Sequence, residues 1–241
     1  MKITVLTLFP EMYNDFLNTS IIGRAIKRGI VEVECVQIRD FATDNYKHVD
    51  DRPFGGGKGQ VMKCQPVLDA LNSVRTDDSY TIMMSPQGKT LTQTKARELS
   101  LKDHIIILCG HYEGIDARVN KYMDEMMSIG DYVLTGGEIA SMVVMDSVIR
   151  LLKGSITEGS ADDESYENGL LEYPQYTQPA DYNGDKVPDI LLSGHHARIE
   201  EYRMEQSLLL TKEKRPDLFE KHVFTDSEKK ILKKLEKEGK I

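Results

Sequence analysis

Short apolar runs recur along the first half of the chain, and each predicts a β-strand. They lie at residues 3–8, 31–36, 80–84 and 105–109. The last two are almost continuously apolar, as strands are when both faces of their sheet are covered. A shorter run at 132–134 predicts a fifth strand.

Helical periodicity separates these runs. Apolar residues at helical spacing predict helices over 20–28, 66–73, 92–99 and 138–152, and Pro66 stands where a helix begins. Strands that alternate with helices are typical of an α/β fold with a parallel sheet. The sequence therefore predicts this fold class for the first part of the chain.

The helix expected over 138–152 carries a charged pair among apolar residues. Ile139, Met142, Val143 and Ile149 are expected to form its buried face, and Asp146 and Arg150 fall on the same face, four residues apart. A buried charged pair is costly unless the charges satisfy each other or serve a site. Two interpretations remain open: a salt bridge that packs the helix, or an arginine held towards a substrate.

The pattern changes after Leu152. Residues 153–168 are polar, acidic and rich in Gly and Ser, which is typical of a linker. Helices are then predicted over 197–211 and 226–237, and Thr225 and Glu228 form a capping box at the second. The sequence thus predicts an α/β domain at 1–152, a flexible linker at 153–168 and a mainly helical domain at 169–241.

Composition narrows the class of protein. No run approaches the about 18 apolar residues of a membrane span, and the N-terminus lacks the features of a signal peptide. Three widely spaced cysteines predict reduced thiols in a cytoplasmic protein and no zinc site. With a net charge of -8, any RNA binding would depend on local basic clusters, which could equally be solvated helix faces. The cysteines are Cys35, Cys64 and Cys109, and the basic clusters are Arg24, Lys27 and Arg28, and Lys212, Lys214 and Arg215.

Three glycine-rich segments, at 50–59, 110–114 and 129–137, are candidate ligand loops. The first is neither a Walker A loop nor a GxGxxG motif. Glycine lets the backbone approach a ligand closely, and ligands of open α/β sheets bind at the carboxyl ends of strands. A tight turn would explain any one segment, but three together predict a shared crevice.

Eight motifs follow one another along the chain, at 8–12, 49–57, 85–88, 109–116, 128–134, 169–171, 176–177 and 191–194. Their order resembles that of the bacterial tRNA (guanine-N1)-methyltransferase family of the SPOUT class, and the resemblance covers residues 1 to about 225. It implies a deep trefoil knot, a homodimer with active sites between subunits, tRNA as substrate, and methylation of N1 of the guanine just 3′ of the anticodon. It also implies S-adenosylmethionine as methyl donor, bound by Ser85, Pro86, Gln87, Gly110, Tyr112, Glu113, Gly114, Ile129, Gly130, Tyr132, Leu134, Gly136 and Gly137.

The resemblance also assigns catalytic roles. Guanine N1 carries a proton at neutral pH, so a carboxylate must remove it while a fixed cation stabilises the charge that spreads to O6. By position, Arg150 matches the family's arginine, and Glu164 matches its catalytic aspartate, with Asp163 as a rival. Glu113 matches a carboxylate associated with a divalent ion, usually Mg²⁺. The chain departs from the family pattern at Ala140, Gln178 and His195.

Two other functions remain to be weighed. One is an RNA methyltransferase of the same class that acts on ribosomal RNA or on a ribose oxygen. The other is an RNA-binding protein without catalysis, which the substitutions at Ala140 and Glu164 would fit. A dinucleotide-dependent dehydrogenase is disfavoured, because no GxGxxG follows the first strand.

Overall fold

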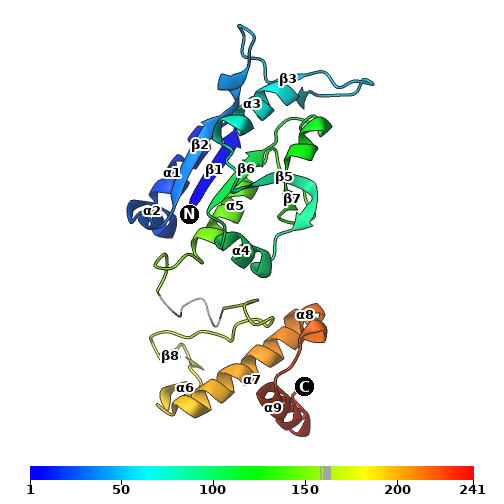
Figure 1. Cartoon of the computed structure of the whole chain (residues 1–241). Coiled ribbons are helices and arrows are strands. Elements are labelled where there is room, and N and C mark those ends of the chain that lie inside the picture. The colour runs from blue at the N-terminus through cyan, green and yellow to red at the C-terminus, as the bar shows by residue number, and fades with distance from the viewer. Residues whose placement is uncertain (158, 160–163) are drawn as a thin grey trace. The chain divides into compact units, whose positions relative to one another are not determined.

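The computed structural model describes residues 1–157, 159 and 164–241, and the chain forms two compact units, Met1–Glu158 and Gly159–Ile241 (Figure 1). A five-stranded sheet forms the centre of the first unit, with the strand order β2-β1-β6-β5-β7, and all of its strand pairs are parallel. The predicted α/β fold with a parallel sheet is therefore confirmed. The strands are β1 (Lys2–Thr7), β2 (Glu32–Gln37), β5 (Ser79–Thr90), β6 (His104–Cys109) and β7 (Glu125–Ser128).

Alternate residues of the central strands supply two apolar clusters, one on each face of the sheet. On β6, Ile105 and Ile107 belong to one cluster and Ile106 and Leu108 to the other, and the whole strand is buried. The first cluster includes residues of η1 (Pro10–Tyr13), α1 (Asn14–Asn18), α2 (Ser20–Lys27), α4 (Gln93–Ser100) and α5 (Glu138–Ile149). The second includes residues of η2 (Ile38–Phe41), α3 (Cys64–Val74) and η3 (Ala117–Tyr122). Both faces are covered, as the apolar strands predicted.

A two-stranded antiparallel ribbon, β3 (Asp50–Asp51) with β4 (Val61–Met62), carries the first glycine-rich loop between its strands. The second unit holds a short hairpin and four helices among its described residues. They are β8 (Asp181–Tyr182), β9 (Asp185–Lys186), α6 (Asp189–Leu192), α7 (His196–Lys214), α8 (Pro216–Lys221) and α9 (Asp226–Lys237). The capping box of α9 is confirmed, because Thr225 and Glu228 bond each other's backbone N–H groups.

The strand predicted over 132–134 is wrong. Tyr132, Val133 and Leu134 are exposed and lie in an irregular segment, and the fifth strand is β7, which pairs with β5. The more polar sequence Glu125–Ser128 forms this strand, and its last two residues, Met127 and Ser128, are buried where they pair with β5. A run of residues that favour strands does not form one where no neighbouring strand supplies hydrogen bonds.

The expected buried face of α5 is wrong in part, because of its four apolar residues only Ile149 is buried. Ile139, Val143 and Asp146 are exposed, whereas Ala140, Ser141, Val144, Met145, Val148 and Ile149 are buried. The helix is apolar almost all the way round, so periodicity does not select a face. A buried salt bridge between Asp146 and Arg150 is excluded by the exposure of Asp146.

The predicted linker stays a prediction. The two compact units meet in sequence between Glu158 and Gly159, inside the range 153–168. Asp163, the rival base, lies outside the described residues, whereas Glu164 lies within them and belongs to the second unit.

Candidate functional site

A cavity of about 480 Å³ lies beside the middle of β5 and the carboxyl ends of β6 and β7. The structure brings together around it all thirteen residues for which the sequence predicts donor binding. They are Ser85, Pro86, Gln87, Gly110, Tyr112, Glu113, Gly114, Ile129, Gly130, Tyr132, Leu134, Gly136 and Gly137. Two of the three predicted glycine-rich segments, 110–114 and 129–137, therefore line one cavity together with residues 83–87, whereas no residue of the segment 50–59 lines it.

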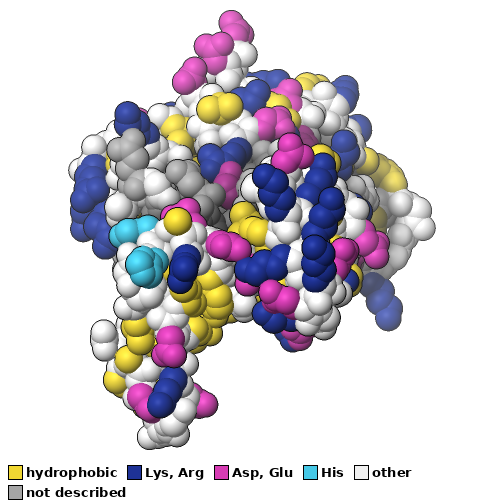
Figure 2. Space-filling model, turned by 90° about the horizontal axis from the view of Figure 1, so that it is seen from below, with side chains coloured by type: hydrophobic (Ala, Val, Ile, Leu, Met, Phe, Trp, Pro, Cys, Tyr) yellow, Lys and Arg dark blue, Asp and Glu magenta, His cyan; other side chains and the backbone are white. Residues whose placement is uncertain are grey.

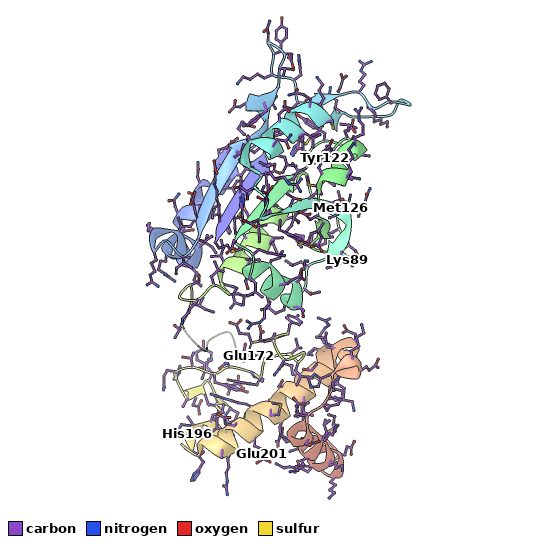
Figure 3. The ribbon with its side chains drawn as sticks, viewed as in Figure 1. Lys89, Tyr122, Met126, Glu172, His196 and Glu201 are labelled. Atoms are coloured by element: carbon purple, nitrogen blue, oxygen red, sulfur yellow. The ribbon has the colours of Figure 1, made fainter. Side chains whose placement is uncertain are left out.

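The first wall of the cavity is a bulge in β5. Met84 and Lys89 are both registered against Met127 of β7, so residues 85–88 loop out of the sheet between them. Figure 3 labels Lys89 and Met126 on these neighbouring strands. The bulge carries Ser85, Pro86 and Gln87 into the cavity wall within a single strand.

The other two walls pack directly on each other, and glycine makes this possible. The N–H of Gly137 donates to the carbonyl of Gly110 at 2.8 Å. A Cβ on Gly137 would lie 2.8 Å from Cα of Cys109, and one on Gly136 would lie 2.5 Å from Nδ1 of His111. A side chain at either position would separate the two loops.

A buried carboxylate supports these two loops. Glu138, at the first position of α5, is 2% exposed and accepts a hydrogen bond from the Thr7 hydroxyl at 2.8 Å. Its other oxygen lies 3.9 Å from Nδ1 of His111, which has no hydrogen-bond partner among the residues that the structure describes. The His111 ring lies between Phe9 and Tyr112, with centroids 4.9 and 5.3 Å away. Sequence reasoning missed Glu138 and His111, although a charged residue directly after Gly136 and Gly137 was a signal.

Tyr13 and Cys109 form a neutral polar pair beneath the site. The Tyr13 hydroxyl lies 2.7 Å from Oγ of Ser141 and 3.4 Å from Sγ of Cys109. Burial raises the pKa of Tyr13, and burial also raises the pKa of Cys109 to about 12. The thiol is therefore protonated at neutral pH and unreactive, and all three cysteines are free thiols, as predicted.

The predicted catalytic and metal residues occupy different places. Glu113 lines the cavity, and its side chain lies where a Cβ on Gly59 would stand, so the first glycine-rich loop lies beside Glu113 without lining the cavity. Among the described residues no group of three or more His, Cys, Asp and Glu side chains could hold a metal. Arg150 is partly buried at the C-cap of α5, and Glu164 belongs to the other compact unit. Their action on one substrate stays a prediction.

The second unit has a cavity of its own, of about 470 Å³. Its lining includes Tyr173, Tyr176, His196 and Arg203. The Arg203 guanidinium lies 4.8 Å from the centroid of the Tyr173 ring, and its Nε is buried without a partner among the residues described. Aromatic rings beside an arginine are suited to stacking on nucleobases.

Fold and site together define an α/β protein with a glycine-lined ligand crevice at the carboxyl ends of parallel strands. The family model of tRNA (guanine-1)-methyltransferase TrmD matches residues 1–221, and the chain belongs to this family of enzymes. The resemblance found in the sequence is thereby confirmed.

Relatives over nearly the full length agree. The chain is 61% identical over 226 residues to the tRNA (guanine-N(1)-)-methyltransferase of Ruminiclostridium cellulolyticum, which covers 92% of this chain and 97% of the relative. It is 51% identical over 239 residues to the protein of the same name from Clostridium botulinum strain Langeland, with 98% and 99% covered. Clostridium perfringens strain ATCC 13124 has another, 52% identical over 235 residues, with 97% and 99% covered. In the described part of the chain, no helix has the length and apolar character to cross a membrane.

Proposed function

We propose that this protein transfers a methyl group from S-adenosylmethionine to N1 of the guanine just 3′ of the anticodon, position 37, of tRNA. One observation carries the proposal: in a chain of this family, two glycine-bearing segments and the bulge of β5 line one cavity. Its volume of about 480 Å³ is in the range that small-molecule sites occupy.

The lining of the cavity suits the proposed donor. Gly110, Gly136 and Gly137 offer backbone without side chains, so a ligand can lie against the main chain. Ile129 and Leu134 supply apolar contacts, and Tyr132 supplies an aromatic ring. These groups match an adenosine that needs an apolar slot and backbone hydrogen bonds.

Two side chains carry the proposed chemistry. Glu164, or Asp163 in its place, accepts the proton of guanine N1, while Arg150 stabilises the negative charge that moves to O6. S-adenosylmethionine supplies the methyl group, whose bond to sulfur breaks as the bond to N1 forms. Glu164 belongs to the second compact unit, and the cavity belongs to the first.

Glu113 is the residue that we propose for Mg²⁺. This cation keeps several waters and is held by one or two carboxylates together with substrate groups. A single exposed carboxylate on the cavity wall fits that mode and does not fit an all-protein cage.

The exposed apolar residues of α5 support the proposed homodimer. Ile139 is 50% exposed and Val143 41% exposed, and Val133 near the start of this helix is 84% exposed. Neighbouring exposed apolar side chains mark association surfaces. We also propose that the chain has the trefoil knot of the family and that the segment 129–137, which packs on Gly110, is part of this knot. We further propose that the protein acts in the cytoplasm, together with its tRNA substrate.

Surface charge supports tRNA binding only locally. Figure 2 shows Lys and Arg side chains interspersed with acidic ones on one face of the molecule. Of the predicted basic clusters, Arg215 is bonded to Asp217 through both Nε and Nη2. The cavity beside Arg203 is the better candidate for contact with unpaired nucleotides.

A methylation assay tests the proposal. Purified protein, S-adenosylmethionine and tRNA with guanine 3′ of the anticodon should yield N1-methylguanosine on nucleoside mass spectrometry, and tRNA with adenosine there should not. A methylated ribose, or methylation confined to ribosomal RNA, would contradict the assigned product. Binding of tRNA without any turnover would favour the noncatalytic alternative.

The two catalytic residues are tested separately. Arg150→Ala should lower turnover about 100-fold or more, because one stabilising donor to a developing oxyanion is lost, and should leave donor affinity unchanged. Glu164→Gln should lower turnover by about 10²–10⁴-fold. If Asp163→Asn has this effect and Glu164→Gln does not, Asp163 is the base.

A further inference from the structure

One side of α7, from residue 203 to the C-cap, contacts the segment 166–173. Residues 203, 207, 211 and 215 stand four apart, so they form a single row along the helix and its C-cap. Each has a polar or cation–π contact with this segment, and the contacts involve Tyr166, Leu171 and Tyr173. Figure 3 labels Glu172 within this segment. We call Arg203, Ser207, Thr211 and Arg215 the α7 row.

The middle of the row holds both backbone groups of Leu171. The Leu171 N–H donates to Oγ1 of Thr211 at 2.9 Å, and the Ser207 hydroxyl donates to the Leu171 carbonyl at 2.5 Å. Thr211 also donates to the Ser207 carbonyl at 2.6 Å. Both hydroxyl side chains are buried, and the preceding Leu170 is 0% exposed. Hydrogen bonds are directional, so this pairing fixes the position of the segment more narrowly than apolar packing would.

The ends of the row hold aromatic rings. Arg215 lies 5.8 Å from the centroid of the Tyr166 ring and donates to the Tyr166 hydroxyl at 3.4 Å, while Asp217 orients its guanidinium. Arg203 lies over the ring of Tyr173 at the other end. Cation–π contacts of this kind are attractive and stabilise the arrangement of the rings.

Glu164 is the first residue of a turn that leads into the segment 166–173. The Tyr166 N–H donates to the Leu170 carbonyl at 2.7 Å, and the Glu172 N–H donates to Oγ of Ser165 at 2.9 Å. The Glu164 carbonyl accepts from the N–H of Glu167 at 3.2 Å. Tyr166 has φ of 74°, a conformation that a non-glycine residue keeps only when its surroundings hold it.

We propose that the α7 row positions Glu164: Ser207, Thr211 and Arg215 fix the turn that begins at Glu164, and so hold its carboxylate for removal of the N1 proton. The inference rests on the proposed function, because it takes Glu164 to be the base. The row touches no reacting atom. Its members are positioning residues, and their effect should appear in the rate of methyl transfer at saturating substrates.

The decisive variant is Thr211→Val, which keeps the shape of the side chain and changes no charge. It leaves the Leu171 N–H without its acceptor, so the turn shifts. We expect a 10- to 100-fold lower single-turnover rate at saturating tRNA and donor, with both dissociation constants within about twofold of wild type. Ser207→Ala should have a smaller effect in the same direction. Arg215→Lys, which keeps the charge and loses the planar fork, should also slow transfer.

A double variant separates positioning from general loss of structure. In the Glu164→Gln background the base is already absent, so Thr211→Val should slow transfer no further. Lys229→Gln is the matched control: it removes an exposed ion pair with Asp226 on α9 and should transfer at the wild-type rate. Thermal melting of each variant reports whether the unit is folded, and Ser207→Ala and Arg215→Lys carry the test if Thr211→Val does not fold.

The outcomes separate this inference from the function on which it rests. Wild-type protein that makes no N1-methylguanosine overturns the proposed function. Wild-type activity together with full activity of Glu164→Gln overturns both the base assignment and the positioning role. Equal rates for wild type, Thr211→Val and Ser207→Ala overturn the positioning role alone, as does equal slowing by Thr211→Val with and without Glu164.

Discussion

The two compact units fix their conformations by different means. In Met1–Glu158 the interior consists mainly of apolar side chains on both faces of the sheet, and every residue of β6 is buried. In the described part of Gly159–Ile241, polar residues are as prominent in the interior as apolar ones. The buried residues there are Leu170, Leu208 and Leu235, and Glu205, Ser207, Thr211 and Glu228.

The difference concerns what each kind of contact can specify. Apolar burial is strong and nondirectional, so it stabilises a scaffold on which loops such as 110–114 and 129–137 are placed. Hydrogen bonds add little net free energy each but set geometry closely. In the second unit Glu205 pairs with Lys234, Glu228 pairs with His222, and Thr211 holds Leu171. We therefore expect substitutions in the first unit to act on stability, and those in the second on geometry and pH response.

The largest effect should come from the apolar interior of the first unit. Ile107 is 1% exposed at the centre of β6, so Ile107→Ala removes buried surface and leaves a cavity. We expect a loss of about 2–5 kcal/mol in the free energy of unfolding of this unit. Urea denaturation followed by circular dichroism measures it.

Leu101→Ala is the control for Ile107→Ala. Leu101 is 84% exposed, so the same kind of truncation should change stability by no more than about 0.5 kcal/mol. If the two variants lose equal stability, or if Ile107→Ala destabilises the second unit as much as the first, the contrast between the units is wrong.

Local signals in the sequence predicted much of this architecture. The apolar run of β6 and the capping box at Thr225 depend on residues close in sequence, and both are confirmed. The family resemblance selected cavity residues from three segments, and the structure places them around one crevice. Whether they bind the donor and whether Arg150 and Glu164 are catalytic are still predictions.

Signals that depend on distant partners could not be read in this way. Glu138 and Ser141 are buried in α5 because Thr7 and Tyr13, far away in sequence, bond to them. No periodicity reveals such partners, and the helix face was therefore predicted wrongly. The α7 row was missed for the same reason, because Ser207 and Thr211 look like ordinary helix-surface residues until Leu171 is placed beside them.

A second prediction concerns steric fit in the first unit. A methyl group on Gly137 would lie 2.8 Å from Cα of Cys109 and 3.1 Å from N of Gly110, and backbone cannot move aside at low cost. Overpacking of this kind costs about 1–3 kcal/mol, which corresponds to about 5- to 150-fold weaker donor binding if the cavity is the donor site. Isothermal titration of Gly137→Ala with S-adenosylmethionine measures this loss.

Gly110→Ala is the comparison for Gly137→Ala. Its added Cβ would meet only the side chain of Ile115, at 3.3 Å, which can give way. We expect a smaller loss of donor affinity than for Gly137→Ala, although both glycines line the same cavity. A larger loss for Gly110→Ala would mean that loop packing against Cys109 does not control the site.

The smallest effect should be a pH response of the second unit. It tests directly whether buried polar contacts control the stability of this unit. Burial alone would raise the pKa of Glu228, but the backbone N–H of Thr225 and the side chains of His222 and Thr225 together lower it below its ordinary value of 4.5. A carboxyl whose pKa is lower in the folded state stabilises that state above its unfolded pKa, and this contribution is lost as pH falls through the folded pKa. The stability of the second unit should therefore decline below about pH 4.5, and Glu228→Gln should be slightly less stable at pH 7 but its stability should depend less on pH in the acid range.

Thermal melts between pH 7 and pH 3 measure this dependence, with Glu236→Gln, at an exposed position of the same helix, as the control. If Glu228→Gln and Glu236→Gln show the same pH dependence, the buried carboxylate does not control the unit, because the buried capping carboxylate would then respond to acid no differently from a solvated one.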